Sequence, residues 1–218
     1  MTTARTPAHA PATSDRAPAA PARTPVPASR GHSWLLLLTG LIGLAASAVL
    51  TLDKLKLMEN PSYRPSCNIN PIISCGSVMR TAQAEAFGFP NPLIGLAAFG
   101  ALAAIGAGLV AGAAYRRWFW LSLQAGTLLG LGFVVWLIDQ ALYEIGALCP
   151  YCMVVWAVVI TAFWYTTVHN LRTGVLPAPA PLRRLAALRF QWLVPAAAYL
   201  VILLLILNRF WYYWSTLL

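Results

Sequence analysis

Charged residues are scarce in this sequence, and acidic residues are the scarcest of them. Asp, Glu, Lys and Arg make up only 10% of the 218 residues, and six residues in all are Asp or Glu. A soluble domain needs a more charged surface, so this composition excludes an ordinary soluble protein. Hydrophobic residues account for 59% of the chain, and the mean hydropathy is +0.67. We therefore expect lipid to surround most of it.

Acids, lysines and arginines are absent from five apolar stretches. A helix of roughly 20 apolar residues crosses a hydrocarbon core about 30 Å thick. Buried helices of a soluble protein are the alternative, but they need a soluble shell that this sequence lacks. The sequence predicts an all-α integral membrane protein, with a four-helix transmembrane bundle and a fifth, C-terminal transmembrane helix. The stretches are 34–52, 92–114, 118–138, 149–168 and 192–207.

The same scarcity of ionisable residues argues against a transporter or channel, whose spans carry such residues along the transport pathway. Only Gln124, inside the third stretch, and Asp139, just after it, come close.

Residues 1–33 contain no apolar run and are rich in proline and alanine, which predicts a disordered tail. The first stretch runs a full membrane length into Asp53, so we expect an uncleaved helix rather than a secretory signal.

Basic residues indicate the orientation, because Lys and Arg accumulate on the cytoplasmic side of membrane proteins. With the amino terminus inside, ten of the 15 Lys and Arg residues lie on that side. The net charge of +9 is then a topology signal, and we expect no nucleic-acid partner because no folded domain gathers these arginines. The outer five are Lys54, Lys56, Arg64, Arg80 and Arg209.

All four cysteines fall on the extracytoplasmic side in this topology, where disulfides persist. Cys67 and Cys75 lie in the loop 53–91, and Cys149 and Cys152 open the fourth stretch. Four cysteines there indicate two redox-active or structural pairs. A zinc site is the less suitable alternative, because all-cysteine zinc sites usually combine two close pairs. We therefore expect no metal.

The motif Cys149-Pro150-Tyr151-Cys152 is typical of thiol–disulfide exchange. Two sulfurs three positions apart at a helix start can form and break a disulfide without unwinding the helix, and Pro150 suits the first turn. The positive end of the helix lowers the pKa of a thiol there. Cys152 lies one turn deeper than Cys149, where a hydrophobic quinone could approach it from the bilayer.

The segment between Cys67 and Cys75 contains a proline and two asparagines, which favour turns, so we expect a flexible arm. Residues 77–87 have the pattern of a short amphipathic helix lying along the membrane surface. Cys75 could then reach Cys149 while Cys67 meets an incoming protein, since each exchange step is the attack of one thiolate on a disulfide sulfur.

No histidine is expected near the cysteines. His9 and His32 lie in the amino-terminal tail, and His169 lies at the cytoplasmic end of the fourth stretch. Proton transfer would then fall to thiols, water or the quinone itself. Asp53 and Glu59 are expected to be solvated charges of the outer loop.

Together these motifs resemble those of the bacterial members of the vitamin K epoxide reductase family. The resemblance covers about residues 34–169, and it implies a four-helix bundle around a quinone in the bacterial cytoplasmic membrane. Menaquinone or ubiquinone would accept the electrons. It implies further that Cys67 exchanges with a partner, Cys75 attacks Cys149, and Cys152 faces the quinone. The matching motifs are Cys67-x7-Cys75, Phe87-Gly88, Pro90-Asn91-x3-Gly95 and Cys149-x2-Cys152.

The resemblance also implies a quinone pocket. Asn91 matches an amide that hydrogen-bonds a quinone carbonyl, although Pro-Asn-Pro is also an ordinary helix-entry turn. Thr81 takes the place of a small hydroxyl residue near the active site; capping its short helix is the alternative. Trp156 stands where vertebrate members carry a tyrosine, and its lack of a hydroxyl argues against an epoxide substrate. On composition alone, Trp156 would face lipid or pack.

Many bacterial relatives carry a fused thioredoxin-like domain, whereas this chain ends at Leu218. We therefore expect a separate thioredoxin-like (DsbA-like) partner, and a thiol:quinone oxidoreductase that supports disulfide-bond formation in exported proteins. The DsbB family has the same task with the opposite order of cysteine pairs, and an adaptor with two structural disulfides is the non-enzymatic alternative. The expected regions are a tail (1–33), a catalytic domain (34–170), a cytoplasmic linker (171–191) and a fifth helix with an aromatic end (192–218).

Overall fold

The computed structural model describes residues 25–177, 179, 181 and 190–216. Regular structure within these ranges is helical, apart from two isolated β-bridges that join Val26 to Tyr115 and Ile73 to Leu148. The segment 1–24 of the expected tail and the segment 182–189 of the expected linker lie outside the described residues. The helices are α1 (Arg30–Glu59), α2 (Cys75–Met79), η1 (Ala82–Glu85), α3 (Asn91–Val110), α4 (Arg117–Asp139), η2 (Gln140–Ile145), α5 (Pro150–Arg172), α7 (Leu193–Arg209) and α8 (Trp211–Trp214).

Local sequence explains where the main helices begin and end. Pro150 begins α5 and Pro92 lies in the first turn of α3, positions at which the missing amide hydrogen costs nothing. Ser29 caps α1 by accepting a hydrogen bond from the backbone N–H of His32. After α4, the π-helix η2 ends at Gly146, whose φ of 67° is a left-handed conformation that glycine adopts without strain.

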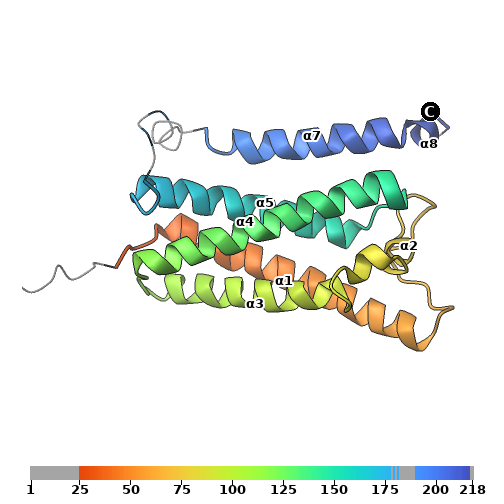
Figure 1. The fold of residues 1–218 in the computed structure, drawn as a ribbon, viewed down its shortest axis with the longest axis horizontal. Helices are drawn as coiled ribbons and strands as arrows, with labels where there is room; N and C mark the ends of the chain where they lie inside the picture. Colours follow the sequence, from red (N-terminus) through yellow and green to blue (C-terminus); the bar gives the residue numbers. More distant parts are fainter. Residues whose placement is uncertain (1–24, 178, 180, 182–189, 217–218) are drawn as a thin grey trace, which may run out of the picture.

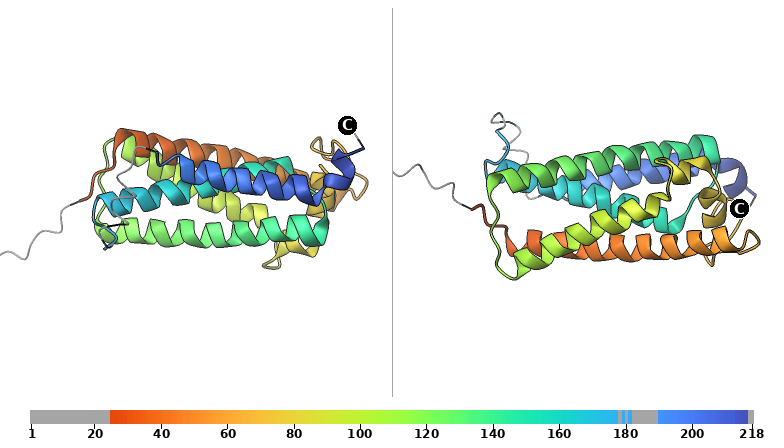
Figure 2. Two further views of the ribbon diagram at one scale, coloured as in Figure 1. Left: turned by 90° about the horizontal axis from the view of Figure 1, so that it is seen from above. Right: turned by 60° about the horizontal axis from the view of Figure 1, so that its bottom comes forward.

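The four long helices α1, α3, α4 and α5 form a bundle with a common long axis (Figure 1, Figure 2). α1 packs along α3 and against α5, and α4 packs against α5. α3 and α4, by contrast, are not closely packed against each other. α7 lies outside this bundle next to α5, where Tyr199 donates a hydrogen bond to the carbonyl of Ala157.

Four of the described helices are long and apolar enough to cross a membrane: α1, α3, α4 with η2, and α5. This agrees with the expected all-α membrane bundle. α7 is an apolar helix of 17 residues at the place of the expected fifth span, and its crossing of the bilayer stays a prediction. Both cysteine-bearing segments, around α2 and before α5, lie at the end of the bundle opposite the start of α1 (Figure 1).

Two local expectations were wrong. α1 does not end near position 52 but continues to Glu59, so Asp53 is helical and buried rather than a solvated loop charge, whereas Glu59 is exposed. The single helix expected over 77–87 is divided into α2 and η1. Thr81 has an extended conformation between them, with ψ of 155°, and its hydroxyl donates to the carbonyl of Val78.

Small residues allow α1 and α3 to approach closely. A Cβ atom built on Gly40 would lie 2.5 Å from the backbone nitrogen of Ala103, and one built on Gly106 would overlap the backbone of Leu37. Backbone atoms cannot yield as a flexible side chain can, so these glycines set the separation of the two helices.

We therefore expect Gly106→Ala to destabilise the protein by about 1–3 kcal/mol, the usual cost of overpacking. Gly132→Ala is the matched control, because a Cβ at this helical glycine of α4 meets nothing within 4 Å. Thermal unfolding of both variants in detergent measures the difference. Equal melting temperatures for the two variants would contradict the tight α1–α3 contact.

Candidate redox site

The structure brings the two cysteine pairs into contact. Cys67 and Cys75 form a disulfide, whereas Cys149 and Cys152 are free thiols. The Cys149 sulfur lies 3.1 Å from the Cys75 sulfur, although 74 positions separate the two residues in the sequence. One free thiol is thus placed directly beside one sulfur of the other pair, an arrangement from which thiol–disulfide exchange can start.

The backbone next to each pair produces this contact. The parallel β-bridge joins Ile73 to Leu148, the residue immediately before Cys149. Leu148 donates its N–H to the carbonyl of Ile72 over 2.7 Å, and its own carbonyl accepts the N–H of Ser74 over 2.8 Å. α2 begins at Cys75 and α5 begins just after Cys149, so the bridge aligns the starts of two helices and the sulfurs that they carry.

The loop cysteines are less accessible than the sequence suggested. Cys67, the expected outer contact, is only 6% exposed, and Cys75 is fully buried. The asparagines of the expected flexible arm instead form ordered turns. Asn70 Oδ1 accepts the N–H groups of Ile72 and Ile73, and Asn68 Oδ1 accepts the N–H of Gly76. In this conformation the disulfide offers almost no surface to another protein.

Cys149 has the electronic character of a reactive thiol. Its pKa is lowered from the usual thiol value, chiefly because the Cys152 side chain hydrogen-bonds to it, with smaller contributions from backbone groups of Cys152 and Tyr151 at the start of α5. Burial opposes this shift, as does the negative charge of Asp53. The stabilised thiolate is the form that exchanges with disulfides.

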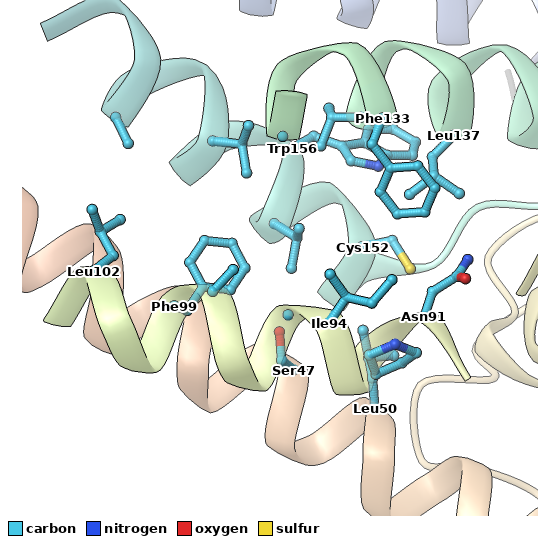
Figure 3. A pocket seen from close by; sticks show the side chains of 18 of the residues that line it. Ser47, Leu50, Asn91, Ile94, Phe99, Leu102, Phe133, Leu137, Cys152 and Trp156 are labelled. Atoms are coloured by element: carbon cyan, nitrogen blue, oxygen red, sulfur yellow. The ribbon is translucent and has the colours of Figure 1, made fainter. Parts of the chain in front are cut away.

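A cavity of about 490 Å³ begins at Cys149 and Cys152 and continues between α3 and α4. Figure 3 shows Cys152 and Asn91 at one end of it, with Trp156 close to Cys152. Its walls are almost entirely apolar, and Lys54 is the charged residue among those that line it. Such a space suits a flat, apolar molecule whose reacting end lies against the thiols. Its apolar walls include Ile94, Phe99, Leu102, Phe133 and Leu137.

Trp156 lines the cavity and does not face lipid. It is 3% exposed, and its indole N–H is buried with no hydrogen-bond partner among the described residues. A buried donor without a partner costs free energy, so this N–H suits a ligand that carries an acceptor.

Asn91 also lines the cavity, but its side chain already bonds to the chain. Nδ2 donates to the carbonyl of Gln83 over 2.7 Å, and Oδ1 accepts the N–H of Ala86 over 3.1 Å. These bonds hold η1 against the start of α3. The amide has a second N–H, which could donate a hydrogen bond to an acceptor on a ligand in the cavity.

Thr81 does not belong to the set of residues that line the cavity. Its hydroxyl donates to the carbonyl of Val78 at the end of α2, as described above. Within the described ranges, no group of three or more His, Cys, Asp or Glu side chains is placed to hold a metal ion.

Two charged residues of this region were not predicted as site residues. Lys54 donates to the carbonyl of Met79 over 2.7 Å and pairs with Glu85 over 2.8 Å, so it ties α2 and η1 to α1. Asp53 lies on the face of α1 whose Leu50 and Leu57 pack into one cluster with the cysteines. The spacing of Leu50, Asp53 and Leu57 on one face of a longer α1 was the signal that could have revealed Asp53.

Comparison with protein-family models matches residues 34–167 to the vitamin K epoxide reductase family. The matched region begins in α1, ends in α5 and contains all four cysteines. No curated protein matches the chain.

The lowered pKa of Cys149 predicts a shift in its reactivity with pH. Because Cys152 is the main cause, Cys152→Ala should raise the pKa of Cys149, and alkylation of Cys149 should then require a higher pH. The alkylation rate against pH, followed by mass spectrometry with the Cys67–Cys75 disulfide intact, measures the shift. Met153→Ala in the same helical turn is the control, and an unchanged profile in Cys152→Ala would contradict the assignment.

Proposed function

The chain belongs to the vitamin K epoxide reductase family and is a multi-pass membrane oxidoreductase, and from this premise we propose that it transfers electrons from a thiol protein to a quinone. The donor in this proposal is a separate thioredoxin-like protein outside the cytoplasmic membrane, which the enzyme reoxidises. The contact between the Cys75 and Cys149 sulfurs, with Cys152 beside an apolar cavity, is the observation that carries the proposal.

In the first step, the partner's two thiols reduce the Cys67–Cys75 disulfide and become a disulfide themselves. The Cys75 thiolate then attacks the Cys149 sulfur of an oxidised Cys149–Cys152 pair, and the electron pair of the broken bond goes to Cys152. Cys67 next attacks Cys75, which restores the loop disulfide and releases Cys149. The state with an oxidised loop pair and two thiols at Cys149 and Cys152 has the cysteine pairing that the structure records.

A quinone would supply an acceptor for two electrons and two protons. The residues fit such a molecule: Trp156 presents an N–H without a partner, Asn91 has a second amide hydrogen, and both lie near Cys152 (Figure 3). Quinone carbonyls are the acceptors that these donors need. The poor packing between α3 and α4 supports access for an apolar ring and tail from the bilayer.

The orientation is part of the same proposal. The cysteines lie at one end of the bundle (Figure 1). The excess of Lys and Arg in the segments that the sequence assigns to the opposite side of the membrane supports a cytoplasmic amino terminus. The four cysteines are then extracytoplasmic, where a thioredoxin-like oxidant of exported proteins works.

We expect purified protein to reduce a quinone when it receives a reduced thioredoxin-like protein. Cys152→Ala should abolish this activity, because the Cys149–Cys152 disulfide that accepts electrons from Cys75 can then no longer form, whereas Met153→Ala should retain it. Absorbance of a soluble ubiquinone or menaquinone analogue follows the reaction. Full activity in Cys152→Ala would refute the relay.

A substitution at Trp156 tests the quinone pocket separately from the cysteine relay. Trp156→Phe keeps an aromatic ring but removes the N–H, so we expect the KM for the quinone to rise about tenfold, the value of one hydrogen bond. Trp118→Phe is the control, since Trp118 is an exposed residue of α4 that does not line the cavity. Steady-state kinetics with varied quinone measures both, and equal KM values would show that the indole N–H does not bind the quinone.

A further inference from the structure

The relay described above gives no role to the aromatic end of the chain, residues 210–214. This segment begins at Phe210, between α7 and α8, and Figure 1 shows α8 at the same end of the bundle as α2. Trp211 and Tyr212 are 58% and 62% exposed, as expected of aromatic residues at a membrane surface. Phe210, by contrast, is fully buried. Its side chain therefore packs inside the protein and not at the membrane surface.

Phe210 packs into the hydrophobic cluster that contains the residues of the β-bridge. Leu148 donates its N–H to the carbonyl of Ile72 over 2.7 Å, and both side chains belong to this cluster and are buried. Phe210 and Ile206 are the buried members that the C-terminal helices contribute. One cluster thus joins both sides of the bridge to α7 and α8. Its other buried members are Val134, Ile138, Ala141, Leu142 and Trp156.

A surface groove next to the bridge has walls from the same segments. Ile73 and Leu148, the two bridged residues, line it together with Pro150 of the CxxC motif. Ile206 of α7 and Trp214 of α8 line it as well. The C-terminal helices therefore flank the segment that leads into Cys149.

Arg209 attaches the junction of α7 and α8 to η2. Its Nε donates to the carbonyl of Leu142 over 2.9 Å, and its guanidinium carbon lies 5.9 Å from the centre of the Phe210 ring. Leu142 is itself fully buried in the cluster. Among the residues of α7, Pro195 and Ile206 are buried. The attachment of this helix near the cysteines therefore depends on Ile206, Arg209 and Phe210.

We propose that Phe210 and Arg209 are positioning residues of the redox site, which hold the β-bridge and, through it, the contact between the two cysteine pairs. The inference deepens the proposed relay, because electrons would pass between the pairs where the Cys75 and Cys149 sulfurs meet. It assigns a role in the redox site to a segment that follows the family-matched region 34–167.

Removal of the Phe210 ring should loosen the sulfur contact. Phe210→Ala leaves a cavity in the cluster, and the surrounding side chains relax only partly into it. Ile72 and Leu148 are then held less firmly, so the Cys75 and Cys149 sulfurs meet less often. Because small displacements have large effects on reactions between positioned groups, we expect their effective concentration to fall about tenfold. Phe210→Leu fills most of the space and should stay near the wild-type value.

The effective concentration is measured with these two cysteines alone. Cys67→Ser and Cys152→Ser leave the Cys75 and Cys149 thiols, which are equilibrated with reduced and oxidised glutathione in purified, full-length protein in detergent. As the Cys75–Cys149 bond forms, one glutathione disulfide is reduced to two glutathione thiols, so electrons and protons balance. Acid quenching, alkylation and mass spectrometry give the fraction oxidised. Neither partner protein nor quinone takes part, so this inference and the proposed function fail separately.

Leu36→Ala is the matched control for a general loss of stability. Leu36 is as fully buried as Phe210, but it packs in the cluster that contains Trp120, near the start of α1 and at the end of the bundle away from the cysteines. Its truncation should lower the melting temperature and leave the effective concentration of the two thiols unchanged. A merely structural role of Phe210 predicts equal effects of the two truncations.

Arg209→Met removes the hydrogen bond to Leu142 and keeps an apolar stem. It should also lower the effective concentration, by less than Phe210→Ala, and it provides the test if Phe210→Ala does not fold. An unchanged value in folded Phe210→Ala, or in Arg209→Met, would overturn the proposal. An equal fall in Leu36→Ala would overturn it as well, as would a fall in Phe210→Leu as large as that in Phe210→Ala.

Discussion

The short β-bridge between Ile73 and Leu148 is the contact on which the redox site depends. It joins two loops that lie far apart in the sequence, and each loop places a cysteine shortly after the bridge, at or beside a helix start. A helix start provides unpaired N–H groups and a positive dipole, both favourable to a thiolate. The bridge thus fixes which sulfur of the loop pair meets the CxxC pair, and the meeting sulfur is that of Cys75.

The unequal packing of the four long helices complements this contact. Glycines bring α1 and α3 so close that no ligand fits between them, and α4 is held by α5. The space that remains lies between α3 and α4, and it ends at Cys149 and Cys152. In a bundle surrounded by lipid, close helix contacts come from small residues rather than from the hydrophobic effect. Between α3 and α4, small residues such as Gly95 and Gly130 line the cavity instead and leave room for an apolar molecule. Small residues therefore hold α1 and α3 in close contact and leave a space between α3 and α4.

Much of this arrangement could be predicted because it follows from local rules. Charge-free stretches of membrane length gave the long helices, and Pro150 gave the start of α5 beside Cys149. Tertiary contacts determined what was missed. α1 continues past the apolar stretch because Leu57 packs against the cysteines, which buries Asp53 with it. The proline and asparagines of the loop indicated turns, but nothing in its sequence reveals that the turns at Asn68 and Asn70 are ordered and bury Cys67.

The burial of Cys67 separates the two exchanges of the proposed relay in time. While the Cys75 sulfur lies 3.1 Å from Cys149, Cys67 is 6% exposed and an incoming thiolate has no path to it. In the proposed relay the loop has to open for the partner, and we expect that opening to move Cys75 away from Cys149. With the loop open, the loop pair can receive electrons from the partner. With the loop closed, it can pass them to Cys149, and neither conformation allows both transfers. In the proposed relay, Cys149 is therefore reduced through Cys75, whose sulfur lies beside its own.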